Sequence, residues 1–252
     1  MQKTGNPVQE REIPVDVREL ASQEEAAQRT YRETDEKRER SFAAGMNFYK
    51  LFWVFFIGCF LGVVIETVWC LATRFRFESR QGLIYGPFNL VYGFGALFMT
   101  LGLSWLSKKR DMWIFVGGFV IGSVFEYLCS FFQEAAFGTV SWQYDHMPFN
   151  LQGRINVLYS IFWGFLALIW IKEIYPRMSR WIEKIPDRAG VALTWILLVF
   201  MLLNTAVSAA AVGRWSARHE GNPPANAADA FLDRQYPDAR MKKIYPNMVF
   251  TE

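Results

Sequence analysis

The sequence has few of the residues from which metal centres and disulfide frameworks are built. Its 252 residues include two histidines, His146 and His219, and three cysteines. Two histidines argue against a histidine-based metal centre, so we expect no bound metal and no cofactor. Cys59, Cys70 and Cys129 lie in apolar segments, and their number is odd. This pattern indicates small packing residues and not a disulfide framework.

Several catalytic and nucleotide-binding motifs are absent as well. The sequence has no G-x-x-x-x-G-K-S/T loop, so it does not bind ATP by that route. It has neither G-x-S-x-G nor H-E-x-x-H, the signatures of common hydrolases. Its net charge of +3 is too small to indicate nucleic-acid binding, and we expect no nucleic-acid partner.

Apolar residues are abundant, and they are concentrated in the middle of the chain. Residues 1–48 and 214–252 are polar and charged, whereas 49–213 hold almost all the aliphatic and aromatic residues. A bilayer core needs about 20 mostly apolar residues in helical form. Five segments meet this length, and we predict an all-α membrane protein with five transmembrane helices at 49–71, 87–107, 112–137, 155–175 and 191–212.

The distribution of basic residues predicts the orientation in the membrane, because cytoplasmic loops are richer in Lys and Arg. A cytoplasmic N-terminus places the charged arm, Lys108-Lys109-Arg110 and the four basic residues of 176–190 inside. The outside receives fewer basic residues, although its first loop contains Arg74, Arg76 and Arg80. We therefore predict a multi-pass cell-membrane protein with a cytoplasmic N-terminus and an external C-terminus. The aromatic and basic stretch 241–245 is interpreted as a segment on the membrane surface.

An internal repeat is the most informative pattern. Glycines four residues apart are followed by a glutamate in the first and third spans, as Gly58, Gly62 and Glu66 and, 60 positions later, as Gly118, Gly122 and Glu126. A Pro-Phe-Asn-Leu motif follows at 87–90 and recurs 61 positions later at 148–151. A one-residue insertion reconciles the two offsets. Since each unit holds two spans, we predict two parallel helix–loop–helix repeats with both motifs on the outer face.

These features divide the chain into five parts. They are a charged N-terminal arm (1–48), repeat 1 (49–110), repeat 2 (111–175), a cytoplasmic loop with the fifth span (176–213), and a C-terminal tail (214–252).

The acidic residues of the spans indicate where a binding site could lie. Glycines four apart allow close helix approach, so the glutamates that follow them lie near helix contacts and away from lipid. A charge in the hydrocarbon core costs on the order of 2.5–3.5 kcal/mol, so such residues normally face a cavity or a partner. We predict a polar substrate-binding pocket between the two repeats, open to the outer face, formed by Glu66, Arg80, Asn89, Glu126, Glu134, Asp145, Asn150 and Arg154.

The same residues have a structural interpretation. Glu66 and Glu126 could hold helices together without any ligand, since a duplicated scaffold keeps what stabilises it. Asparagine next to proline often forms turns. Trp142 and Tyr144 are typical of membrane-interface anchors.

The sequence also resembles a known family, the bacterial "putative ABC-transporter type IV" permease-like family, also called CmpB-like. The residues that carry the resemblance are Gly82, Tyr85-Gly86-Pro87, Tyr92-Gly93, Gly122–Glu126, Glu134, Phe137-Gly138, Trp142, Tyr144-Asp145, Pro148, Asn150, Gly153-Arg154-Ile155, Tyr236-Pro237-Asp238 and Lys242–Asn247. The resemblance covers roughly residues 49–247. It implies a transport permease with a separate ATPase or another membrane subunit as partner. Only 176–188 is long enough to serve as a cytoplasmic docking element, because the 108–111 connection is too short.

Three functions are compatible with these patterns. The first is a transporter or permease component. The second is a membrane-embedded enzyme that acts on a lipid-linked substrate at the outer leaflet, with Glu126, Glu134 or Asp145 as general acid or base. The third is a membrane scaffold that binds other proteins through the fifth span and the tails. The sequence does not decide between catalysis and transport, and it does not identify the substrate.

Overall fold

The computed structural model of the protein describes residues 23–31 and 41–251. The chain separates into two compact units, Met1–Ser41 and Phe42–Glu252, and each is described by itself. In the first unit, residues 23–31 are helical and exposed. The rest of the predicted charged arm up to residue 40 lies outside the described residues.

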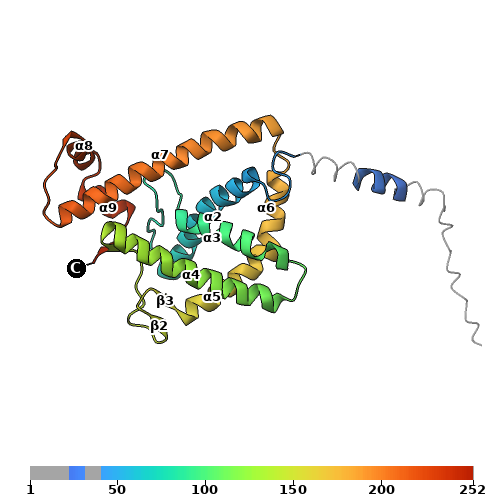
Figure 1. Ribbon diagram of the computed structural model, residues 1–252, viewed down its shortest axis with the longest axis horizontal. Coiled ribbons are helices and arrows are strands. Elements are labelled where there is room, and N and C mark those ends of the chain that lie inside the picture. Colours follow the sequence, from blue (N-terminus) through green and yellow to red (C-terminus); the bar gives the residue numbers. More distant parts are fainter. Residues whose placement is uncertain (1–22, 32–40, 252) are drawn as a thin grey trace, which may run out of the picture. The chain divides into compact units, whose positions relative to one another are not determined.

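The second unit is mostly helical (Figure 1). Its elements in chain order are α2 (Phe48–Arg74), α3 (Leu90–Leu103), η1 (Ser104–Leu106), α4 (Asp111–Phe137), β1 (Thr139–Val140), β2 (Asn150–Leu151), β3 (Ile155–Asn156), α5 (Val157–Ile169), η2 (Trp170–Ile174), α6 (Tyr175–Ile182), α7 (Asp187–His219), α8 (Ala227–Gln235), α9 (Asp238–Ile244) and β4 (Val249–Phe250). The strands form two antiparallel pairs, β1 with β4 and β2 with β3.

Among the described residues, four helices are long and apolar enough to cross a membrane. They are Phe48–Thr73, Asp111–Phe137, Val157–Ile182 and Asp187–His219. The protein is therefore a multi-pass membrane protein with a helical membrane domain. The segment predicted as the second span, 87–107, forms a shorter apolar helix, Leu90–Leu106. The other four predicted spans match the long helices, although the helix predicted at 155–175 begins later, at Val157, and ends later, at Ile182.

Asparagine side chains start four of the described helices. The N-cap residues of α2, α3, α5 and α8 are Asn47, Asn89, Asn156 and Asn226, and each side chain accepts a hydrogen bond from a backbone N–H of the first turn. Such caps satisfy donors that have no partner within the helix. Gly138 ends α4 in a left-handed conformation, with φ of 58°, which glycine adopts at little cost.

The two Pro-Phe-Asn-Leu motifs occupy different positions, so the predicted one-residue insertion is wrong. The first motif leads directly into α3, because Asn89 is the helix cap. The second motif is followed by the short β2–β3 hairpin, and α5 begins only at Val157 with Asn156 as its cap. The hairpin turns through Gln152 and Gly153, both with left-handed φ values. The connection between α4 and α5 is therefore longer, relative to that between α2 and α3, than an alignment of the two motifs indicates.

Glycines bring the helices of each pair into close contact. A Cβ added to Gly58 would lie 2.8 Å from the Ala96 Cβ on α3, and one added to Gly118 would overlap the Ala167 Cβ on α5. In the same way, Gly62 lies against Tyr92 and Gly122 against Trp163. Small residues in membrane helices permit this approach, and the resulting van der Waals contact holds the helices together.

Polar contacts group the ends of the helices into two sets. At one end, which we call the basic end (Lys50, 107–113 and 172–188), Lys50 bonds to Glu183 and Lys172 bonds to Asp111. At the other, which we call the loop end (75–89, 138–156 and 214–251), the Ser216 hydroxyl donates to the Phe137 carbonyl over 2.7 Å. Strand β4 also pairs with β1 at the loop end.

The segment from Gly82 to Asn89 is not helical, yet it reaches far into the helical unit. The Asn89 N–H donates to the Cys59 carbonyl over 3.1 Å, and Cys59 follows the start of α2 by 11 residues, or about 16 Å of helix. Within the segment, the N–H groups of Gly82 and Leu83 donate to the Phe88 carbonyl, and the backbone of Ile84 and Tyr85 is held by α7. The Ile84 N–H donates to the Ser208 hydroxyl, and the N–H and C=O of Tyr85 both bond to the Asn204 side chain. Figure 1 shows this segment running between α2 and α7 before α3 begins.

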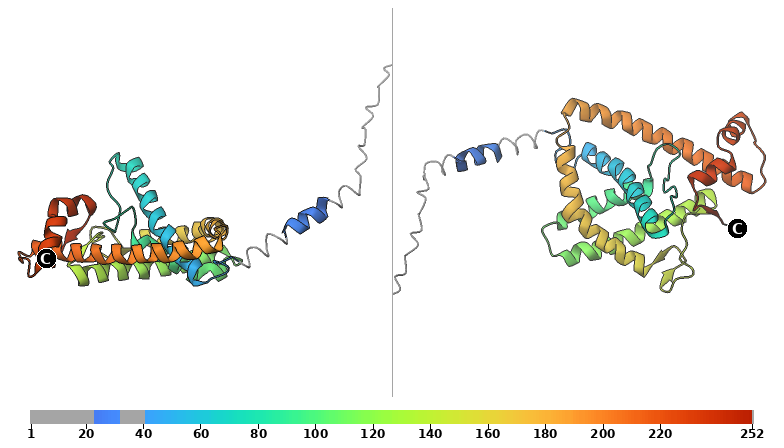
Figure 2. Two further views of the ribbon diagram at one scale, coloured as in Figure 1. Left: turned by 90° about the horizontal axis from the view of Figure 1, so that it is seen from above. Right: turned by 180° about the vertical axis from the view of Figure 1, so that it is seen from behind.

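The C-terminal tail packs against the protein through the stretch 241–245, which the sequence predicts to lie on the membrane surface. Met241 and Tyr245 are buried in a cluster with Ile84 and Trp215. Figure 2 shows the tail curled against the C-terminal end of α7 in both views. The apolar side chains of 241–245 therefore face protein and not lipid.

Candidate functional site

The first group of predicted site residues surrounds Arg80, in the loop after α2. Its guanidinium lies 3.3 Å from the Glu66 carboxylate on α2 and 2.9 Å from the Glu78 carboxylate. The same guanidinium lies 3.2 Å from the Cys70 sulfur. Arg80 is mostly buried, whereas the Glu66 side chain is 34% exposed. The acidic side of this pair is therefore not covered by the rest of the chain.

The second group surrounds Arg154, in the loop after α4. Arg154 forms an ion pair with Glu134 and donates to the Ser130 hydroxyl over 3.2 Å. Its guanidinium also lies over the rings of Tyr127 and Phe131, at 5.9 and 5.6 Å from their centroids, within the range of cation–π attraction. The acid, Glu134, is 35% exposed. In each helix pair, an arginine of the connecting loop thus forms an ion pair with a glutamate of the first helix, Arg80 with Glu66 and Arg154 with Glu134.

Glu126 differs from these ion-paired glutamates, because both of its oxygens accept hydrogen bonds from neutral groups. The Tyr144 hydroxyl donates to one oxygen over 2.7 Å, and the Trp163 indole N–H donates to the other over 2.9 Å. Glu126 is only 8% exposed. The carboxylate thus connects α4 to the following loop and to α5.

Tyr144 bonds to Glu126, and its pKa responds to carboxylates of both helix pairs. Burial raises the pKa of Tyr144, and the Glu126 carboxylate raises it further by proximity and by its hydrogen bond. The Glu66 carboxylate acts on the Tyr144 pKa in the same direction, so Glu66 lies within electrostatic range of this hydroxyl. The ring of Tyr144 stacks on Tyr159 of α5, with centroids 4.6 Å apart. The structure thus places Tyr144 against Glu126 of α4 and Tyr159 of α5.

The remaining predicted site residues have local structural roles. Asn89 caps α3, and its amide also donates to the Arg80 carbonyl over 3.3 Å. Asn150 bonds to the Met147 carbonyl and to the Gly153 N–H, as turn-forming asparagines do. Asp145 is exposed, and its carboxylate lies against Gly153, where a Cβ would overlap it. Gly153 therefore makes room for Asp145 in this turn.

Sequence reasoning did not identify Asn204 and Ser208 of α7, which hold the segment of Gly82–Asn89. Both are buried, with Asn204 2% exposed and Ser208 3%. Their spacing of four residues in a span without charges is a signal that could have found them, because buried polar groups in membrane helices need partners. Trp142 and Tyr144 were interpreted as interface anchors. In the structure, however, Trp142 donates to the Arg154 carbonyl over 3.2 Å and Tyr144 bonds to Glu126.

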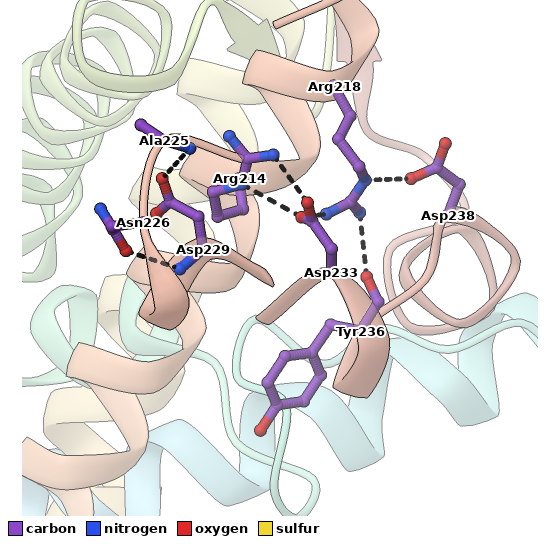
Figure 3. A network of polar contacts seen from close by, with 8 residues as sticks. All are labelled: Arg214, Arg218, Ala225, Asn226, Asp229, Asp233, Tyr236 and Asp238. Atoms are coloured by element: carbon purple, nitrogen blue, oxygen red, sulfur yellow. Dashed lines mark hydrogen bonds and ion pairs between the residues drawn. The ribbon is translucent and has the colours of Figure 1, made fainter. Parts of the chain in front are cut away.

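A third polar network joins the tail to α7. Figure 3 shows Arg214 and Arg218 reaching from the end of α7 to Asp233 on α8, with Arg218 also bonded to Asp238 of α9. The Arg218 guanidinium donates to the Tyr236 carbonyl as well. The hydroxyl of Tyr236 lies 2.8 Å from that of Tyr85. The network therefore fixes the tail over the segment that enters between α2 and α7.

The side chains of the site determine which ligands it could hold. In the part of the chain that the structure describes, no group of three or more His, Cys, Asp or Glu side chains is arranged to bind a metal ion. The groups that could meet a ligand are two arginines, two partly exposed glutamates and a tyrosine.

The sequence of this region matches a known protein family. The family described as "Putative ABC-transporter type IV" matches residues 53–209. This range runs from α2 into α7 and includes both arginine–glutamate pairs, Glu126 and Asn204, but not the tail. No curated protein and no solved structure matches the chain. Because the match covers more than half of the sequence, the chain belongs to the family described as "Putative ABC-transporter type IV".

Proposed function

We propose that the protein is a permease component that carries a small polar substrate through a site between its two helix pairs. The observation that carries this proposal is the non-helical segment of Gly82–Asn89, which lies beside the middle of α2. Within a membrane, irregular backbone is stable only where it is buried in protein or lines a cavity. Transporters form their substrate sites from such interrupted helices.

We further propose that α3 is a fifth crossing. Its N-terminal part packs on α2 at Gly58 and Gly62, and Thr100 near its end accepts a hydrogen bond from Trp170 of η2, beside the basic end. The helix therefore runs from the loop side towards the basic end. With five crossings, the start of α2 and the C-terminal tail lie on opposite sides of the membrane. We assign the basic end to the cytoplasm, in agreement with the excess of Lys and Arg there.

A duplication of the helix pair is also part of the proposal. Residues 92, 93 and 96 of α3 face Gly58, and residues 163, 164 and 167 of α5 face Gly118. Each contact residue on α5 thus follows its counterpart on α3 by 71 positions, while the two glycines are 60 positions apart. Such equal spacing supports two parallel repeats that have diverged in the connecting loops.

The two arginines are the proposed ligand-binding groups, and Glu66 and Glu134 are the acids that respond to the ligand. Both arginines keep a buried Nε–H that has no partner among the described residues. An unpaired buried donor costs about 1–3 kcal/mol, so a ligand that accepts a hydrogen bond there would bind favourably. We assign Glu126 a positioning role, because its oxygens are already bonded to Tyr144 and Trp163.

Substitution of the acids tests this site. Glu134→Gln and Glu66→Gln break the ion pairs but keep the size of the side chains. We expect near-normal abundance in the membrane together with loss of function, measured as complementation of a strain that lacks the gene. Glu173→Gln is a matched control, because Glu173 also pairs with an arginine but lies at the basic end. Normal complementation by Glu134→Gln and Glu66→Gln at normal abundance would contradict the proposal.

A separate ATPase is the proposed energy source. The family description supports it, and the sequence has no phosphate-binding loop of its own. Chemical crosslinking in membranes should connect the basic end, and not the tail, to an ATPase subunit. Crosslinks from the tail alone would contradict both this partner and the assigned orientation.

A further inference from the structure

The third of the four long helices is interrupted before its end. The range Val157–Ile182 is continuous, but Trp170–Ile174 is a π-helix, and Figure 1 shows the chain turning there. π-helical turns bend helices and are frequent at functional positions. After this turn α6 runs beside the start of α2, where the Lys50 ammonium donates to the Ser179 hydroxyl over 2.5 Å. The helix thus divides into a crossing part, α5 together with η2, and a part that lies across the basic end, α6.

Helix α6 has two different faces. Met178, Ser179 and Ile182 are buried against the rest of the protein. On the opposite side, Trp181 is 69% exposed, and Arg177 and Arg180 are exposed as well. A short helix with a tryptophan and cations on its outward side is typical of the membrane interface, where an indole sits at headgroup level.

The charges of the basic end are unbalanced. It has nine basic residues and four acidic ones. All four acidic residues already have partners, since Asp111, Glu173 and Glu183 form ion pairs and Asp187 accepts a hydrogen bond from the Phe42 N–H. Within the described residues, no carboxylate pairs with Arg180, Lys184 or Arg188. These three exposed cations are therefore available to an anion from outside the chain.

Two more tryptophans border the same end. Trp105 and Trp113 are 70% and 61% exposed, and they flank the exposed run of Lys108, Lys109 and Arg110. Aromatic side chains next to unpaired cations, repeated on two connections of one end, match the headgroup layer of an anionic leaflet.

We infer that the basic end binds the phosphate headgroups of anionic phospholipids, with Arg180, Lys184 and Arg188 as the main contacts and α6 lying in the interface. Basic residues near an anionic surface are attracted to it, and the attraction falls off within a Debye length. The outward cations of 176–188 then contact lipid headgroups, so a separate ATPase would dock on the parts of the basic end that these cations leave free. The inference rests on the orientation of α6 and not on the proposed transport function.

The test uses the purified full-length protein in detergent, with added phosphatidylglycerol or phosphatidylcholine. We expect phosphatidylglycerol to raise the thermal unfolding midpoint more than phosphatidylcholine, and high salt to reduce the difference. In the variant Arg180→Gln/Lys184→Gln/Arg188→Gln the difference should fall by at least half. Lys242→Gln/Lys243→Gln is the control, because both lysines are exposed but lie in the tail.

A second variant keeps the test decisive if the triple variant fails to fold. Arg180→Lys/Arg188→Lys retains the charges, and it should retain the full preference for phosphatidylglycerol. An unchanged preference in the triple variant, or an equal response to both lipids in the unaltered protein, overturns the inference. If the triple variant keeps its lipid preference but loses crosslinks to an ATPase subunit, the surface docks the ATPase and the inference is wrong.

Discussion

At the scale of single residues, the site separates into groups that hold the structure and groups that can meet a ligand. Glu126 belongs to the first kind, because Tyr144 and Trp163 already donate to both of its oxygens. Glu134 belongs to the second, since it is partly exposed and bonded to an arginine that keeps an unpaired donor. Glu126 and Glu134 both belong to α4, yet they have different roles.

The role of Glu126 leads to a prediction about its substitutions. Glu126→Leu removes both acceptors and leaves the Trp163 N–H and Tyr144 O–H unpaired, at about 1–3 kcal/mol for each buried group. Glu126→Gln keeps an acceptor for Trp163 and presents a donor to the Tyr144 oxygen. We expect a clear loss of thermal stability in detergent for Leu and little loss for Gln. Equal stability of the two variants would show that these hydrogen bonds are unimportant.

Asn204 gives a second prediction at this scale. Its side chain accepts from the Tyr85 N–H over 3.1 Å and donates to the Tyr85 C=O over 2.7 Å. Asn204→Ala leaves both backbone groups unpaired, so we expect a destabilisation of about 2 kcal/mol or more, measured by denaturant unfolding in micelles. Leu203→Ala is the neighbouring control, since Leu203 is 63% exposed. The explanation fails if the two variants are equally stable.

At the scale of the elements, the helix pairs depend on close contact at glycine. A Cβ at Gly118 would overlap Ala167, which has no flexible side chain that could move aside. At Gly58 the corresponding distance to Ala96 is 2.8 Å, so less movement is needed. Both contacts are predicted by the sequence pattern of glycines four apart, whereas their partners on α3 and α5 are not.

Alanine substitutions test these contacts. We expect Gly118→Ala to destabilise the protein by about 1–3 kcal/mol through overpacking, and Gly58→Ala to have a smaller effect. Gly213→Ala is the control in α7, because no atom lies within 4 Å of its added Cβ. That substitution should be neutral or stabilising, since alanine favours helices over glycine. Thermal unfolding of the three variants checks the order, and the reverse order would contradict the packing.

The tail helices depend on an ionic contact that responds to pH. The hydrogen bond from Arg214 holds the pKa of Asp233 below its usual value of 3.8, with burial opposing and Arg218 adding to the effect. Because the folded pKa is the lower one, this contact stabilises the tail above about pH 4 and is lost as the pH falls through the folded pKa.

We therefore expect hydrogen exchange in α8 and α9 to increase when the pH is lowered below that range. Asp233→Asn should produce the same increase at pH 7. Glu220→Gln, an exposed acid close in sequence but outside the Arg214 contact, serves as the control. A tail that stays equally protected in Asp233→Asn at pH 7 would show that other contacts hold it.

At the scale of the whole molecule, the contacts assign every loop to one of two ends, and α3 decides how many crossings join them. Cysteines at Phe77, Ser107 and Asn222 test this arrangement with a reagent that does not cross membranes. Phe77→Cys and Asn222→Cys should react in intact cells, and Ser107→Cys only after permeabilisation. If Phe77→Cys and Ser107→Cys react from the same side, α3 does not cross the membrane.

Much of the fold follows from the sequence itself. Long apolar runs form helices in a membrane because their backbone groups bond within the segment, so α2, α4, α5 and α7 could be located from local composition alone. The packing of the tail does not follow from composition, because the partners that bury Met241 and Tyr245 come from the loop after α2 and from α7. Local composition contains no information about such partners.

For the site, the sequence determined which residues are charged within apolar helices and that they recur. It also placed these glutamates and two loop arginines in one predicted pocket. Only the tertiary structure decided that Glu126 bonds to Tyr144 and Trp163 whereas Glu66 and Glu134 bond to arginines. It also decided that α3 starts beside the middle of α2, held there by α7. The physical reason is that hydropathy sums over neighbours in the chain, whereas a buried polar group is satisfied by whichever helix packs against it.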